Sequence, residues 1–218
     1  MNSRHTKIFG IIAGIMIMIS GIQFVQWVVP FDIIESKAQA LHVFNHIKEG
    51  IIYTILMNGS YLLFLPIALL LTIKLYCRKP ILSLLCISLF LFGMIADFIG
   101  SVPYLTQAAY ILPECKKNNI DAINLFSSFY LPMRLFAMVG TGLSFLSFLL
   151  WGINLIFSNK ITGIFLILTF LSMVLAGIFT PFSSELALFA VGSSFFLFGI
   201  SQICVSFIVP SLNVQIKK

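Results

Sequence analysis

Six apolar runs, each about as long as a helix that crosses a bilayer, constrain the fold more than any other feature of the chain. They lie at residues 8–29, 51–73, 81–102, 133–157, 161–179 and 186–209. A spanning helix needs about 20 mainly apolar residues. Of the 218 residues, 60% are hydrophobic and 9% are charged, whereas soluble domains carry about 25% charged residues. The sequence therefore predicts an all-α, polytopic membrane protein with six transmembrane helices in a single domain, residues 1–218.

The charged residues between the runs predict the orientation of such a bundle. Both termini and the segments 74–80 and 158–160 share one side, which holds eight basic residues and no acidic one. The opposite segments hold four basic and six acidic residues. An excess of positive charge is typical of the cytoplasmic side, so we expect both termini inside the cell (N-in/C-in). The eight basic residues are Arg4, Lys7, Lys74, Arg78, Lys79, Lys160, Lys217 and Lys218.

Two segments on the expected outer side are longer than turns. Residues 31–50 have the pattern of an amphipathic helix, with Asp32 and Glu35 in the spacing of a capping box. We expect this helix to lie on the outer surface or to run into the second spanning helix. Residues 104–131 contain the sequence PECKKNNID and predict a turn-rich loop followed by a short helix that ends at Pro132.

Polar side chains within the runs gather in one leaflet. Asp97 is the only acidic residue inside any run, and Arg134 is the only basic one in a comparable place. Gln23, Gln26 and Asn58 lie at similar depths in other helices. Unpartnered polar groups in hydrocarbon cost several kcal/mol, so these five predict a pocket that opens outward around an Asp97–Arg134 core. The alternative is a structural ion pair with interfacial glutamines.

His42, His46 and Glu49 form an H-x3-H-x2-E pattern in the outer amphipathic segment. On a helix this spacing places two imidazoles and a carboxylate on one face, a set that can bind zinc or another divalent ion. No other cofactor is indicated. HExxH is absent, so the pattern lacks the general base of a metalloprotease. The alternative is a solvated polar face.

Residues 140–178, GTGLSFLSFLLWGINLIFSNKITGIFLILTFLSMVLAGI, combine a Gly- and Leu-rich helix, a short basic turn and a second apolar helix. This stretch resembles the corresponding part of uncharacterised bacterial six-helix integral membrane proteins. The resemblance implies a bacterial inner (cytoplasmic) membrane setting and brings no activity or functional residue.

Three functions are compatible with these features. The first is binding or transport of a small molecule or lipid through the outer-leaflet pocket. The second is a membrane-embedded enzyme acting on a lipid or headgroup, with the histidines over the mouth of the pocket. The third is a non-catalytic assembly or accessory protein whose polar residues only hold helices together. The expected partners are membrane lipid and a possible small-molecule ligand. Nucleic acid is not expected, because the basic residues sit in short segments that set orientation.

Overall fold

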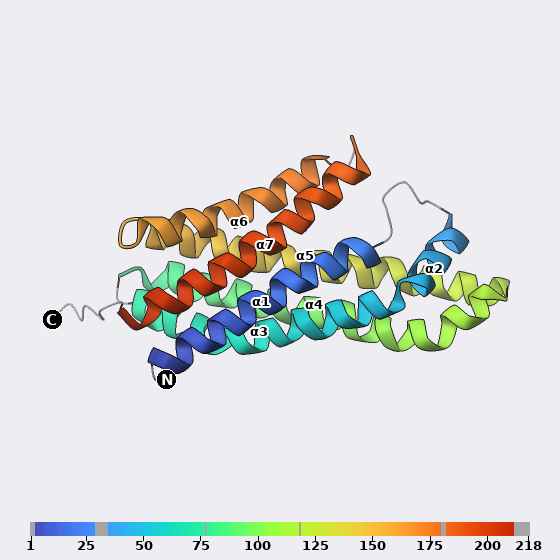
Figure 1. Ribbon diagram of the computed structural model, residues 1–218, viewed down its shortest axis with the longest axis horizontal. Helices are drawn as coiled ribbons and strands as arrows, with labels where there is room; N and C mark the ends of the chain where they lie inside the picture. The colour runs from blue at the N-terminus through green and yellow to red at the C-terminus, as the bar shows by residue number, and fades with distance from the viewer. Residues whose placement is uncertain (1–2, 29–34, 77, 118, 180–181, 212–218) are drawn as a thin grey trace.

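A computed structural model describes residues 3–28, 35–76, 78–117, 119–179 and 182–211 as a helical bundle (Figure 1). Within these ranges, six helices are long and apolar enough to cross a membrane, and α2 is not. The prediction of an all-helical chain with six candidate spans is thus confirmed. The elements are α1 (Ser3–Trp27), α2 (Ser36–Asn45), α3 (Ile47–Tyr76), α4 (Pro80–Lys116), α5 (Ile120–Leu155), α6 (Lys160–Phe179), α7 (Ser184–Ile208) and the 3-10 helix η1 (Val209–Ser211).

The short connections carry residues that start the next helix. Pro80 occupies the first turn of α4, where its missing N–H would have no intrahelical partner in any case. The Asn119 side chain accepts hydrogen bonds from the N–H groups of Asp121 and Ala122 at the start of α5. Asn159 and Ser183 cap α6 and α7 in the same way. Polar residues between the apolar runs therefore set where the spanning helices begin.

Glycines set the closest approaches between helices. A Cβ added to Gly14 of α1 would lie 2.6 Å from the carbonyl oxygen of Gly199 in α7, and one on Gly140 of α5 would lie 2.6 Å from that of Gly93 in α4. Gly152 of α5 meets Gly163 of α6 similarly, at 2.9 Å. Small residues allow helix backbones to pack this tightly in a membrane. These contacts fix how α1 lies against α7, and α5 against both α4 and α6.

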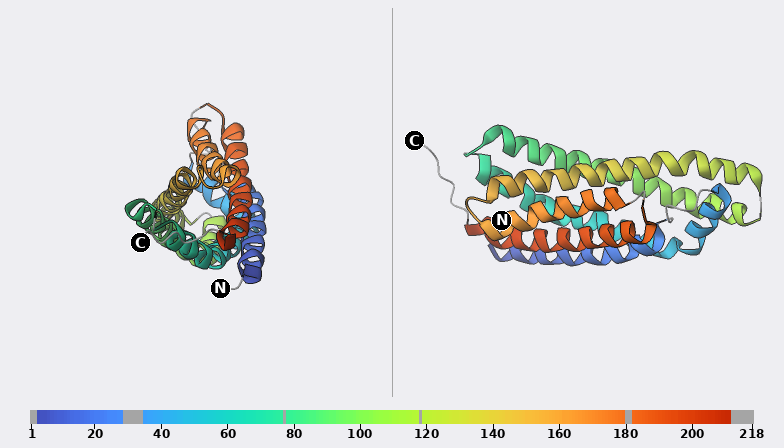
Figure 2. Two further views of the ribbon diagram at one scale, coloured as in Figure 1. Left: turned by 90° about the vertical axis from the view of Figure 1, so that its left-hand side faces the viewer. Right: turned by 90° about the horizontal axis from the view of Figure 1, so that it is seen from above.

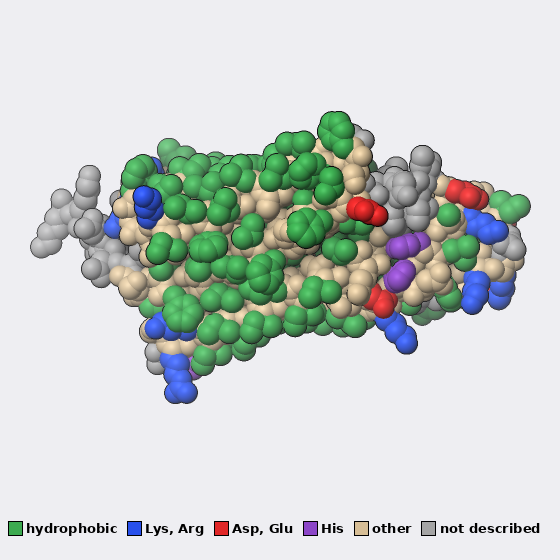
Figure 3. All heavy atoms as spheres, turned by 45° about the horizontal axis from the view of Figure 1, so that its top comes forward, with side chains coloured by type: hydrophobic (Ala, Val, Ile, Leu, Met, Phe, Trp, Pro, Cys, Tyr) green, Lys and Arg blue, Asp and Glu red, His purple; other side chains and the backbone are tan. Residues whose placement is uncertain are grey.

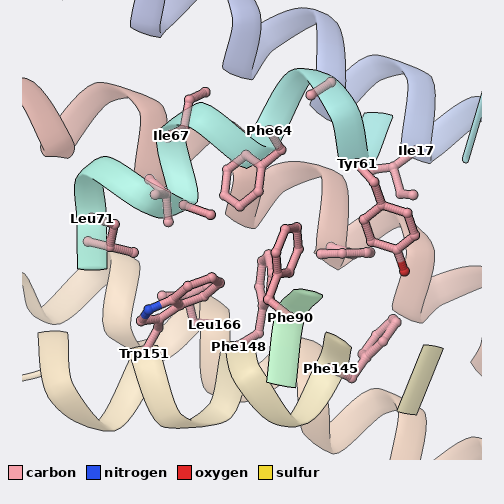
Figure 4. Close-up of a cluster of buried hydrophobic side chains, with 14 of the residues drawn as sticks. Ile17, Tyr61, Phe64, Ile67, Leu71, Phe90, Phe145, Phe148, Trp151 and Leu166 are labelled. Atoms are coloured by element: carbon pink, nitrogen blue, oxygen red, sulfur yellow. The ribbon is translucent and has the colours of Figure 1, made fainter. Parts of the chain in front are cut away.

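The six candidate spans form an apolar belt, and charged side chains gather at its two ends (Figure 3). Both termini lie towards the same end, which we call the terminal end (Figure 2). Rings from α3, α4 and α5 fill the centre of the bundle (Figure 4). The centroids of Phe64 and Phe148 lie 5.8 Å apart, and those of Phe90 and Trp151 lie 5.6 Å apart. All four side chains are fully buried.

At the opposite end, α4 and α5 extend well past the other spanning helices (Figure 1). α4 continues to Lys116, and residues 102–116 add about 22 Å of helix beyond Ser101. Within residues 104–131, the predicted turn-rich loop is wrong, because α4 runs to Lys116 and α5 begins at Ile120. The short helix predicted to follow is confirmed, but it continues through Pro132 instead of ending there. We call α2 with residues 102–116 and 120–134 the head.

The predicted amphipathic helix at 31–50 is also different in the structure. Residues 31–34 lie outside the described residues, α2 ends at Asn45, and α3 begins at Ile47. The segment leads into the second spanning helix, as one of the two expectations had it, with a break at His46. α2 itself packs against α4 and α5. Its Ala40 and Val43 are buried in a small separate core, to which the other helices contribute Leu112, Cys115, Ala122 and Phe126. The apolar face of α2 is therefore covered by the extended α4–α5 hairpin.

We predict that Gly140→Ala destabilises the bundle, because the new methyl group would overlap the backbone of α4. Overpacking of this kind typically costs about 1–3 kcal/mol. Gly142 is the matched control, since nothing lies within 4 Å of a Cβ added there. Thermal unfolding in detergent should show a lower Tm for Gly140→Ala and an equal or higher Tm for Gly142→Ala. Equal effects of the two substitutions would contradict the close α4–α5 contact.

Candidate functional site

A cluster of buried polar side chains lies in the half of the bundle next to the head. Asp97 of α4 is fully buried. The Thr141 hydroxyl lies beside its carboxyl group. The carboxyl group is also close enough to Tyr53 and Tyr61 of α3 to interact electrostatically with both. Among the side chains that the structure describes, none makes a hydrogen bond of standard geometry to either carboxylate oxygen.

Asn58 joins the same cluster from α3. Its side-chain amide donates to the Thr54 carbonyl oxygen at 2.9 Å and to the Ser101 hydroxyl at 3.2 Å. Ser101 lies one turn after Asp97 on the same face of α4. The side-chain oxygen of Asn58 is buried and has no hydrogen-bond partner among the described residues. The structure thus brings two of the five predicted pocket residues, Asn58 and Asp97, into one cluster.

A cavity of about 100 Å³ borders this cluster. Ser101 and Thr141 belong to its lining, and Asp97 lies behind them. The rest of the wall is mainly apolar and aromatic, and all six spanning helices contribute to it. Met138 lines the cavity while half of its surface is exposed on the outside of the bundle. The remaining lining residues are Phe24, Trp27, Val28, Tyr53, Gly100, Met133, Ala137, Met173, Leu188, Val191 and Phe195.

The two glutamines do not meet Asp97 in this cavity. Gln26 is exposed and lines a groove between α1 and α7 on the outside of the bundle. Gln23 is half-buried and does not line the cavity. Both glutamines lie on the last turns of α1, where polar side chains commonly meet the edge of an apolar belt. Neither supports the predicted pocket core.

The Arg134 side chain lies outside the described residues, so the structure does not test the Asp97–Arg134 pair predicted from the sequence. The backbone of α5 shows how far an arginine at position 134 would have to reach to pair with Asp97. Asp97 lies beside Thr141, and position 134 is two helical turns, about 10 Å, nearer the head. Helix side chains tilt towards the N-terminus of their own helix, which in α5 is the head end. Pairing would therefore require an arginine stem that runs against this tilt.

His42 and His46 lie together in the head, with ring centroids 4.7 Å apart. The helix is interrupted at His46, so Glu49 lies on α3 instead of one turn further along α2. No three His, Cys, Asp or Glu side chains within the described ranges are placed to hold a metal ion. Burial and the neighbouring His46 lower the pKa of His42 below its usual 6.5, and the backbone of Val28 acts in the opposite direction. The two imidazoles do not line the cavity.

Several residues of the cluster are not singled out by the sequence alone. Tyr53, Tyr61, Ser101, Thr141 and Ser144 are common residue types in membrane helices. A signal exists only for α5, where Thr141, Ser144, Trp151 and Asn154 are buried at the three- and four-residue spacing of one helix face. That regular polar spacing in an apolar helix indicates a buried interface.

Comparisons with protein-family models, curated proteins and solved structures found no match for the chain. The resemblance of residues 140–178 to uncharacterised bacterial six-helix proteins therefore stays a prediction.

We predict that Asp97→Asn and Arg134→Gln have nearly additive effects on the free energy of unfolding. The two-turn offset along α5 is the reason, because distant sites add to within about 0.5 kcal/mol. A buried pair would behave differently: breaking it by removing one partner costs about 3–5 kcal/mol, and removing both costs much less. Chemical unfolding of the two single variants and the double variant in detergent measures this. If the double variant lost clearly less stability than the sum of the two single losses, the two residues would be paired.

We predict that the head loses stability in mild acid. Because the pKa of His42 is lowered in the folded protein, the unfolded chain takes up this proton first as the pH falls below about 6.5. Hydrogen exchange of the α2 amides should therefore be faster at pH 5.5 than at pH 7.5, after correction for the intrinsic rates. His42→Gln should reduce the difference, while His5→Gln, an exposed histidine of α1, should not. If His42→Gln showed the same increase in exchange at pH 5.5, protonation of His42 would not be the cause.

Proposed function

We propose that the protein binds an apolar molecule with a hydrogen-bonding end in the cavity between its six spanning helices. The observation that carries this proposal is the cavity itself, whose apolar wall ends on Ser101 and Thr141 in front of a buried polar cluster. Ligand pockets commonly have an apolar wall with a few polar groups that fix orientation. Met133, Met138 and Met173 suit a flexible chain, because methionine adapts to irregular shapes.

The cavity has a possible route of entry from the side of the bundle. The α6–α7 hairpin leans away from α1 and α5 at the head end (Figure 1). Met138 of α5 lines the cavity and is half exposed. Leu188 and Val191 of α7 also line the cavity, and Leu188 is partly exposed. A molecule dissolved in the surrounding bilayer would enter here without crossing water. Towards the terminal end, the packed rings of Phe64, Phe90 and Phe148 close the bundle.

We further propose that the head lies outside the cytoplasm, as the charge distribution predicts. The cavity would then take its ligand from the outer leaflet of a cell membrane. An enzyme acting on lipid headgroups receives no comparable support, because His42 and His46 lie in the head and do not line the cavity. The alternative is that the polar cluster has a purely structural role, and the ligand experiment below distinguishes this role from binding.

The orientation can be measured by cysteine labelling. In a variant without the four native cysteines, we expect Lys117→Cys to react with an impermeant maleimide in intact cells. Lys79→Cys should react only after permeabilisation. Both native lysines are exposed and lie at opposite ends of the bundle, whereas native Cys115 is only 1% exposed and would be a poor probe. The opposite labelling pattern would reverse the proposed orientation.

Ligand binding can be tested with a long-chain alcohol that carries a diazirine on its chain. Irradiation of the protein in nanodiscs, followed by peptide mass spectrometry, should locate adducts on cavity residues such as Met133 and Met173. Met138→Trp narrows the cavity and should reduce these adducts about tenfold, which corresponds to about 1.4 kcal/mol. Val139→Trp, on the neighbouring exposed position, is the matched control. Adducts that are spread evenly over the apolar belt, or that Met138→Trp does not reduce, would contradict binding in the cavity. The polar cluster would then have a purely structural role.

A further inference from the structure

The oxygen atoms around Asp97 form a set that the proposed ligand cavity does not use. Both carboxylate oxygens, the Ser144 hydroxyl and the Tyr61 hydroxyl are buried and have no hydrogen-bond partner within the described part of the chain. Asp97, Ser144 and Tyr61 are each fully buried. Thr141 interacts with the Asp97 carboxyl group and Ser144 with the Tyr61 hydroxyl, but neither contact has the geometry of a standard hydrogen bond. Buried polar groups without well-formed hydrogen bonds are costly, so the cluster requires an explanation.

The backbone geometry shows that these oxygens converge from three helices. Gly93 and Gly140 let α4 and α5 touch, and the space above Gly93 is filled by the Ser144 hydroxyl. Gly93 lies one turn before Asp97 on the same face of α4, so the carboxyl and Ser144 share one interface. Thr141 lies beside the carboxyl, and Tyr61 reaches Ser144 from α3. The groups that converge here are one carboxylate and three hydroxyl groups, with no nitrogen or sulfur donor.

A carboxylate in this position needs a positive partner. An isolated buried charge is strongly disfavoured, and proteins normally pair it or neutralise it. The one ion pair between described side chains is Lys117–Glu114 at the tip of the head, far along α4 from Asp97. Position 134 is two turns away along α5. A cation bound by the carboxylate and the three hydroxyl groups would supply this positive charge.

We propose that Asp97, Thr141, Ser144 and Tyr61 form a binding site for a small monovalent cation, with Na⁺ as the ion that fits best. Oxygen ligands suit hard cations of this kind. A single carboxylate matches one positive charge, whereas Ca²⁺ takes six to eight oxygen ligands and Mg²⁺ keeps several waters. The Phe90 ring packs against Tyr61 with centroids 5.7 Å apart, and both side chains are fully buried. In these buried surroundings, charge balance favours one bound cation for one carboxylate.

The site would also link the ion to the ligand cavity, and this part rests on the proposed function. Thr141 belongs to both, since it lies beside Asp97 and also lines the cavity. A bound cation would contact the oxygen of the Thr141 hydroxyl, so the hydroxyl hydrogen would point away from the ion. If the ligand binds better when the Thr141 hydroxyl is held in this way, the bound cation raises the affinity for the ligand. By linkage, the bound ligand then raises the affinity for the cation by the same factor.

The cation site can be tested without any ligand. The protein in nanodiscs is unfolded thermally at pH 8, with NaCl replacing choline chloride at constant ionic strength. We expect the Tm to rise by several degrees and to saturate, because an ion that binds only the folded state stabilises it. Asp97→Asn should abolish the rise, and Ser144→Ala should increase the apparent Kd for Na⁺ at least tenfold. Ser147→Ala is the matched control, because this buried hydroxyl already donates to the Ser144 carbonyl oxygen.

Each remaining outcome has a definite meaning. No Na⁺-dependent rise in the native protein, or an equal rise in Asp97→Asn, would overturn the proposal. A Tm that depends on pH through Asp97 but not on Na⁺ would show that a proton neutralises the carboxyl, and would also overturn it. The diazirine experiment is independent of this measurement. A saturable Na⁺ response without cavity adducts would therefore keep the cation site and remove the proposed function.

Discussion

The close contact of α4 with α5 is the constraint on which the rest of the molecule depends. Because Gly93 and Gly140 have no side chains, the two backbones approach until Asp97 lies against Thr141 and the space above Gly93 is filled by Ser144. Larger residues would separate the two helices and remove the carboxylate from Thr141. The same pairing continues beyond the apolar belt, where the two helices form the hairpin that supports α2. One helix–helix contact thus positions both the buried cluster and the head.

The spanning helices could be predicted from the sequence because lipid imposes a simple length and composition rule. Hydrocarbon cannot hydrogen-bond to backbone groups, so an apolar run of about 20 residues has no stable alternative to a helix. The rule says nothing about residues 102–134, where the chain leaves the belt. There Asn119, Pro113 and Pro132 are typical of turns, but α4 and α5 continue through both prolines. Packing of Leu112 and Phe126 against α2 supplies the stability that local propensity does not indicate.

The candidate site was only partly predictable for a related reason. A carboxylate or an amide inside an apolar run is rare enough to be noticed alone, which is why Asp97 and Asn58 could be identified. The hydroxyls of Tyr61, Thr141 and Ser144 are ordinary in membrane helices, and only the register of α3, α4 and α5 shows that they converge. Depth alone also misleads, since Gln26 shares the depth of Asp97 and yet faces the outside of the bundle. The sequence predicts how deep a residue lies in the bilayer more readily than whether its side chain faces the inside or the outside of the bundle.

The arrangement of polar and aromatic layers limits what movement could follow binding. Below the cluster, Phe90, Phe148 and Phe198 interlock, with centroids of Phe148 and Phe198 only 4.5 Å apart. Nearer the terminal end, Ser83, Trp151 and Asn154 again carry buried polar atoms that have no hydrogen-bond partner among the described residues. Two polar layers on the α4–α5 interface are thus separated by one aromatic layer. Passage from one polar layer to the other would require Phe148 of α5 and Phe198 of α7 to separate. A pure binding protein would keep these rings in place, so the mobility of the Phe148–Phe198 contact is the physical difference between binding and transport in this bundle.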